Sequence, residues 1–249
     1  MNSIQAMAWR TFSLHFRQVY DGGWRYLDRC GEFMLAATKE MDFMAREAKP
    51  TGAMMDIPEQ GISVALDASE MVVTQDQPED SGESFQKICT GLDSLANQFF
   101  TPMGIVTNGL ASKSIWPMPT ADAVLASTLN LGNTINADLA KVVEMVPSFM
   151  KVDCNFSSGN LDLHVVVQAV TFEKVSLYRH SAGFQASASK IRRAERLNKA
   201  AARFDATLHH GLMLEVDLIE FDPPKTSLQN HFRELNRHTD ALRTRFALP

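Results

Sequence analysis

Several segments of this sequence alternate between apolar and polar residues, and this period of two constrains the fold more than any other feature. In LMLEVDLIEF, residues 212–221, every second residue from Leu212 to Leu218 is apolar, whereas Glu215 and Asp217 lie between them. A half-buried β-strand shows this pattern because successive side chains point to opposite faces of a sheet. Comparable patterns predict strands at residues 11–20, 62–67, 71–75, 150–156 and 161–172.

Two of the extended segments carry an irregularity. Residues 101–116 look extended, with a break at Asn108-Gly109. In residues 161–172 the alternation shifts by one position at Val170, which suggests a β-bulge.

Other segments repeat their apolar residues every three to four positions, which is the period of an amphipathic helix. Thr226 and Gln229 have the spacing of a capping box in front of the last of these segments. Gly211 fits a glycine that ends the segment before it. Residues 49–61 hold two prolines and two glycines and are predicted to form a loop. The predicted helices span residues 24–44, 85–99, 135–146, 190–210 and 226–248.

The order of these elements repeats along the chain. A hairpin, a helix, an extended segment and a second helix occur at residues 62–146 and again at 149–248. We therefore predict an α+β fold of two pseudo-repeated ββαβα units, with antiparallel sheets covered by helices, behind an N-terminal strand and helix. The corresponding domains are residues 1–148 and 149–249.

Composition indicates a globular protein of the cytoplasm. Hydrophobic residues make up 45% and charged residues 21% of the 249 positions, which are ordinary values for a folded domain. No apolar run reaches the roughly 18 residues of a membrane span, and the N-terminus lacks the pattern of a secretory signal. Cys30, Cys89 and Cys154 are isolated in the sequence, so we expect neither structural disulfides nor a cysteine zinc site.

A basic segment stands out because the whole chain has a net charge of −5. On a helix, its four cationic positions Arg192, Arg196, Lys199 and Arg203 fall on one stripe, nearly opposite an apolar stripe. Such a stripe can be a solvated helix face, can dock an acidic protein partner, or can hold nucleic-acid phosphates. It lacks the interleaved aromatic residues that stack on single-stranded bases.

Candidates for catalysis are few. Asp162 and His164 share a face of a predicted strand, and an Asp–His pair can orient a general base. Glu215 and Asp217 also share a strand face, but the polar side of a half-buried strand explains them equally well. No nucleophile elbow, P-loop, dinucleotide fingerprint or H-E-x-x-H motif accompanies them. We therefore expect no catalytic residue, metal or cofactor.

Methionine is unusually frequent, with 13 copies. Methionine fills gaps in cores and also serves adaptable binding surfaces. Met54 and Met55 lie in the predicted loop and are candidates for contact with a partner.

Three stretches carry a resemblance to other proteins. They are GWRYLDRCGEF at 23–33, ISVALDASEMVVTQ at 62–75, and LEVDLIEF with LQNHFRELNRHTDALRTRFAL at 214–248. There the chain resembles a sporadically distributed bacterial family of uncharacterised proteins. The resemblance implies a bacterial origin and an α+β build, and it carries no activity or residue role.

Taken together, the sequence predicts a non-enzymatic cytoplasmic protein that acts through protein–protein association, as a homodimer or a subunit of a larger assembly. One alternative is a nucleic-acid-binding protein that uses the basic residues of 190–204. Another is an enzyme with a cleft between the two halves.

Overall fold

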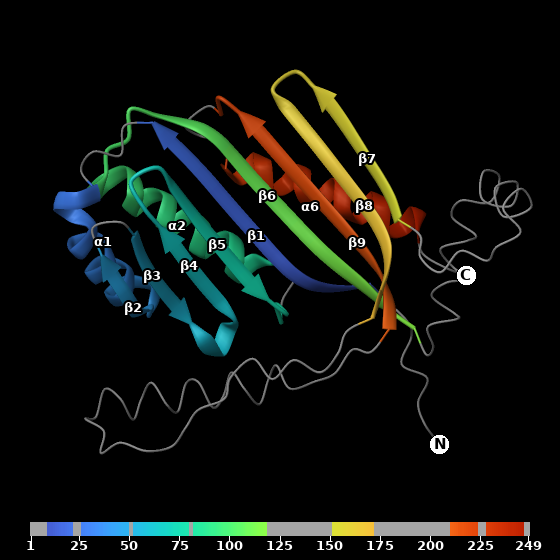
Figure 1. The fold of residues 1–249 in the computed structure, drawn as a ribbon, viewed down its shortest axis with the longest axis horizontal. Helices are drawn as coiled ribbons and strands as arrows, with labels where there is room; N and C mark the ends of the chain where they lie inside the picture. Colours follow the sequence, from blue (N-terminus) through green and yellow to red (C-terminus); the bar gives the residue numbers. More distant parts are fainter. Residues whose placement is uncertain are drawn as a thin grey trace, which may run out of the picture.

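A computed structural model describes residues 9–21, 26–49, 52–79, 82–118, 151–171, 210–223 and 228–246 (Figure 1). Within these ranges the strands form one nine-stranded antiparallel sheet in the order β2-β3-β4-β5-β1-β6-β9-β8-β7. The strands are β1 (Arg10–Asp21), β2 (Met44–Lys49), β3 (Gly52–Ile57), β4 (Ile62–Leu66), β5 (Glu70–Asp76), β6 (Gly104–Pro117), β7 (Lys151–Ser158), β8 (Leu161–Thr171) and β9 (His210–Phe221). The helices are α1 (Tyr26–Met41), α2 (Glu83–Phe99) and α6 (Leu228–Arg245), with the short 3₁₀ helix η1 (Pro58–Gln60).

The three described α-helices lie on one face of the sheet, which we call the helix side (Figure 1). Alternate residues of the strands point into the core there, as Leu14 and Phe16 do in β1. The rings of Phe85 in α2 and Phe232 in α6 meet edge to face at 6.1 Å between centroids. The opposite face, called the second face, carries the remaining strand residues, including His15 and Arg17 of β1.

The prediction of two ββαβα units, each with its own sheet, is wrong. Strand β1 pairs with β5 on one side and with β6 on the other, and β6 continues the sheet to β9. The buried apolar side chains form a single core cluster that includes Leu14, Leu110 and Leu218. A repeated order of elements does not determine which strands pair, because pairing depends on contacts between distant parts of the chain.

Several local predictions are also corrected. Residues 52–57 of the expected loop form strand β3 and residues 58–60 form η1. Helix α1 ends at Met41, before the expected residue 44, because Asp42 adopts a left-handed φ of 59°. Strand β6 runs through Asn108-Gly109 without a break, and β8 pairs with β9 in unbroken register through Thr171, so no bulge lies at Val170.

Gly211 has a different role from the predicted one. It lies inside β9, and His210 is the first residue of that strand rather than the last of a helix. A Cβ atom at position 211 would approach the Ile115 side chain to 2.8 Å and the Trp116 carbonyl oxygen to 2.9 Å. Glycine is therefore required by the close approach of β6.

The other strands and helices match their sequence patterns. The hairpin β4–β5, helix α2, the hairpin β7–β8, strand β9 and helix α6 all lie where periodicity places them. The helix predicted at 135–146, residues 190–209 of the next one, and the expected domain boundary at 148/149 lie outside the described residues.

Arg243 near the end of α6 ties this helix to the centre of the sheet. Its Nη2 group donates to the hydroxyl groups of Thr11 in β1 and Ser114 in β6, both at 2.7 Å. The Trp9 indole donates to the Arg243 carbonyl oxygen at 2.9 Å. The last described helix is thereby fixed to the first described strand.

Candidate functional site

Strand β7 forms one border of the sheet, and no strand in the described part of the chain pairs with its outer side (Figure 1). Its inner side pairs with β8 in unbroken register, from Lys151 opposite Gln168 to Ser158 opposite Leu161. Only Lys151 and Asp153 are charged among its eight residues. An unpaired strand of this kind presents a row of backbone donors and acceptors to another chain.

The direction of these backbone groups follows from the hydrogen-bond pattern. The Phe221 N–H donates to the Asn160 carbonyl oxygen at 2.8 Å, and these two residues follow directly on the Leu161–Glu220 pair, so they continue the β8–β9 register by one position. Hydrogen-bonded and non-hydrogen-bonded residue pairs alternate along antiparallel strands. The even-numbered residues of β8 therefore form their backbone hydrogen bonds with β9, and the odd-numbered residues form them with β7. In the β7–β8 register, odd-numbered residues of β8 lie opposite even-numbered residues of β7, so the even-numbered residues of β7 bond to β8. Four residues direct their N–H and C=O groups outward: Lys151, Asp153, Asn155 and Ser157.

The side chains of β7 divide between the two faces. Val152, Cys154 and Phe156 point to the helix side, because they lie opposite Val167 and Val165 of the core and Leu163, which packs against the core. Helix α6 contacts β9 and β6, which are the second and third strands inward from β7. Phe156 is 55% exposed. Phe156 thus adds an exposed apolar side chain to an edge that no described strand covers.

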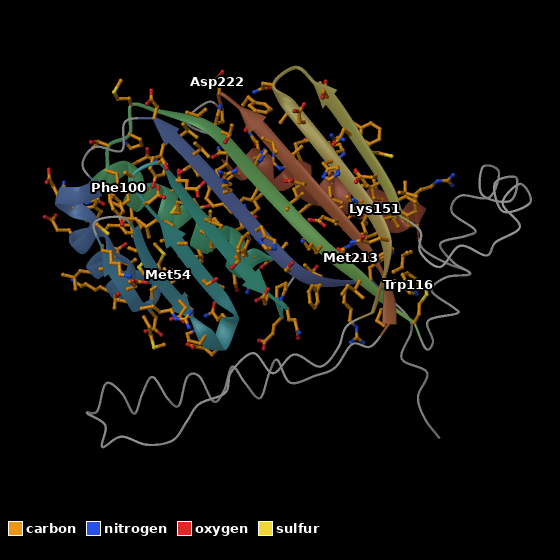
Figure 2. All side chains as sticks on the ribbon, viewed as in Figure 1. Met54, Phe100, Trp116, Lys151, Met213 and Asp222 are labelled. Atoms are coloured by element: carbon orange, nitrogen blue, oxygen red, sulfur yellow. The ribbon has the colours of Figure 1, made fainter. Side chains whose placement is uncertain are left out.

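On the second face, β7 contributes to a hydrogen-bonded cluster. The His164 Nε2 group donates to one carboxylate oxygen of Asp153 at 2.6 Å, and the Lys151 ammonium group contacts the other at 2.6 Å. The bonds from Lys151 and from His164 lower the pKa of Asp153. Figure 2 shows Lys151 at this border of the sheet. The predicted partner of His164, Asp162, is replaced by Asp153 from the neighbouring strand.

Further ionisable groups continue inward across the second face. Asp217 of β9 lies directly opposite His164, and burial raises its pKa. The predicted neighbours Glu215 and Asp217 do share this face, and Glu215 forms an ion pair with Lys113 at 3.1 Å. Burial, together with the charge of Lys113, lowers the pKa of His15 in β1. These groups form a broad polar strip across the sheet.

One hollow of the described surface is lined by Met54, Ala65 and Glu70 among others and another by Asn97 and Asp222 among others, and neither of these two includes His164. Among the described residues, no group of three or more His, Cys, Asp and Glu side chains is arranged to hold a metal ion.

A second polar cluster lies beneath the helices. The Gln18 amide donates to Asp93 at 2.7 Å and to the Asn108 side chain at 3.2 Å. His231 lies 3.6 Å from Glu220, and burial lowers the pKa of this histidine. His231 and Asn108 are almost fully buried, so this cluster positions α2 and α6 on the sheet rather than meeting a ligand.

The opposite border, strand β2, differs from β7. The β2–β3 register is shifted between Ala45 and Glu47, and three of its six residues are charged. Arg46 forms an ion pair with Asp56 at 3.1 Å, and the Asp56 side chain is 4% exposed. Lys49 also forms an ion pair with Glu47. Bulges and charges are the usual protection of a sheet edge against further pairing.

The binding residues expected from sequence are only partly placed. Arg192, Arg196, Lys199 and Arg203 lie outside the described residues, so their role stays a prediction. Met54 is 40% exposed on β3 near the β2 border (Figure 2), whereas Met55 is fully buried, so the two do not form one contact patch. The edge of β7 was missed, because the alternation in 150–156 identifies a strand but not its position in a sheet.

Comparison of the sequence with protein-family models and with curated proteins gives no match. The resemblance seen in the sequence therefore stays a prediction. None of the described helices has the length and apolar character needed to cross a membrane.

Proposed function

We propose that this protein acts in the cytoplasm by binding other protein chains, and that the outer edge of β7 receives a β-strand of the partner. One observation carries the proposal: β7 is a regular edge with no described strand on its outer side, with four outward-directed residues and an exposed phenylalanine, Phe156. In strand addition, backbone hydrogen bonds supply affinity and alternate side chains supply specificity.

The charged residues of β7 support this assignment. Charged residues and bulges protect an edge against an incoming strand, and β7 has no shift of register and two charged residues in eight, where β2 has a shift and three in six. Lys151 and Asp153 form an ion pair with each other, and His164 also bonds to Asp153. The ionisable strip beside it extends over the sheet surface, which fits the contact of a macromolecule better than the enclosure of a small substrate.

A proline at position 155 tests the proposal. The Asn155 N–H points away from β8, so Asn155→Pro removes a donor from the outer edge without removing a β7–β8 hydrogen bond. The matched control is Asn155→Ala, which keeps the N–H. Wild type and both variants are purified from their host cells with an affinity tag, and native mass spectrometry records every complex, with other copies or with other proteins.

We expect complexes with the wild type and with Asn155→Ala, and at least about tenfold weaker association with Asn155→Pro. Thermal unfolding should be similar for all three, which shows that the fold is intact. The same complexes in the folded proline variant, or no complex with any of the three proteins, would contradict the proposal.

A further inference from the structure

We propose that the strand received by β7 is the β7 of a second copy, and that a two-fold axis passes through Cys154. This inference rests on the proposed function and names its partner. The two sheets would then continue into one another, with the helices of both copies on the same side. An isologous contact of this kind closes on itself and gives a dimer.

The backbone favours this register. Directly opposite residues of an antiparallel pair point to the same face, and outward-directed residues must meet outward-directed residues. With the axis at Cys154, Lys151 meets Ser157 and Asp153 meets Asn155 of the second copy, so all four outward residues form bonded pairs. With the axis at Asp153 or at Asn155, only three of the four residues find a partner within the strand.

The side chains favour the same register. On the helix side, the exposed Phe156 ring of each copy lies against Val152 of the other, which removes both phenylalanines from water. On the second face, the Asp153 carboxylate accepts from the Asn155 amide of the second copy. An axis at Asp153 would instead place two carboxylates directly opposite each other, which is unfavourable.

This register makes a specific prediction for Cys154. Cys154 would lie opposite its own copy in a non-bonded pair, where Cα atoms are about 4.5 Å apart. That distance lies in the range of about 4.4 to 6.8 Å that a disulfide spans. The Cys154 side chain is partly exposed, whereas Cys30 and Cys89 are buried. A mild thiol oxidant should therefore link two chains at position 154.

The first experiment is cross-linking of the full-length protein with diamide. Two Cys154 thiols form an S–S bond and give up two protons and two electrons, which reduce diamide to its hydrazine. We expect a covalent dimer on a non-reducing gel that dithiothreitol reverses. Cys154→Ser should abolish the covalent dimer but keep the non-covalent dimer in native mass spectrometry.

The second experiment exploits the predicted opposition of positions 153 and 155. Asn155→Asp places two carboxylates opposite each other at both symmetry-related sites and should weaken the dimer about tenfold or more. Asn155→Lys places an ammonium group opposite each carboxylate and should keep or strengthen it. Sedimentation equilibrium measures both dissociation constants, and circular dichroism confirms that both variants are folded.

The outcomes separate this inference from the proposed function. If complexes respond to Asn155→Pro but contain another protein, or form without a Cys154 cross-link, the two-fold register is wrong and the edge remains a binding surface. Equal effects of Asn155→Asp and Asn155→Lys would also overturn the register. If Asn155→Pro does not weaken the complexes, both proposals are wrong.

Discussion

The two borders of the sheet, β2 and β7, differ in how open they are to pairing with a further strand. Strand β2 has a shifted register and three charged residues in six, whereas β7 has a regular register and two in eight. Each border also holds a carboxylate paired with a cation. At β2 the carboxylate is Asp56, whose side chain is 4% exposed, and at β7 it is Asp153, whose side chain is 40% exposed.

This difference in burial indicates what each ion pair contributes. A buried carboxylate that loses its partner costs free energy, because the protein cannot replace the hydrogen bonds of water. An exposed pair contributes little, because solvent screens it. We infer that the β2 border serves the stability of the fold and that the β7 border is adapted to contact. Variants at both borders test this contrast.

The largest effect on stability is expected from Arg46→Ala at the β2 border. Asp56 would keep its burial but lose the guanidinium at 3.1 Å, so the free energy of unfolding should fall by roughly 1–3 kcal/mol. Urea denaturation measures the change, and Arg46→Lys, which keeps a cation, should lose less. Association should not change. A loss below about 0.5 kcal/mol would show that the ion pair does not matter for stability.

Phe156→Ala should separate association from stability at the β7 border. The ring is 55% exposed, so its removal should change the free energy of unfolding by no more than about 1 kcal/mol. The complex should weaken several-fold, because the ring is buried only on association. Leu35→Ala on α1 is the matched control, since Leu35 is 70% exposed and far in sequence from β7. Equal effects of both variants on the complex would argue against a contact at Phe156.

The smallest effect is expected from Asp153→Asn and depends on pH. The pKa of Asp153 is lowered by folding, so its contribution to stability is present above the ordinary carboxyl pKa of 3.8 and is lost as the pH falls below it. Asp153→Asn should therefore make stability depend less on pH on the acid side.

Asp217 of β9 contributes to stability with the opposite sign, because burial raises its pKa and disfavours its charged form. Asp217→Asn should therefore slightly stabilise the protein at neutral pH. Urea midpoints between about pH 3 and 7 measure both.

Local patterns predicted most strands and helices but not the sheet. The alternation of 212–221 and the 3.6-residue period of 226–248 identify β9 and α6, because one face of each is buried. Strand β3 was missed although Ala53, Met55 and Ile57 alternate, because Pro50 and Pro58 bracket it within ten residues. Prolines mark ends of elements, and a six-residue strand fits between two of them.

The functional surface was less predictable. The pairing of β1 with β6 and of β6 with β9 joins residues about one hundred positions apart, and nothing in a local period encodes it. The cluster of Asp153, His164 and Lys151 was missed for the same reason, since Asp153 reaches His164 only through the β7–β8 register. The period of two could predict the face of each residue but not its neighbour.

The central place of β1 has a consequence for how the chain folds. The strand nearest the N-terminus separates two four-stranded parts, β2 to β5 and β6-β9-β8-β7, and Arg243 at the far end of the chain bonds to it. Its neighbour β6 pairs on the other side with β9, which follows about one hundred residues later in the chain. Contacts this distant in sequence slow folding. A growing chain therefore holds an incomplete sheet that is open at β6 until β9 has been made, and an unpaired strand edge of this kind is prone to aggregation.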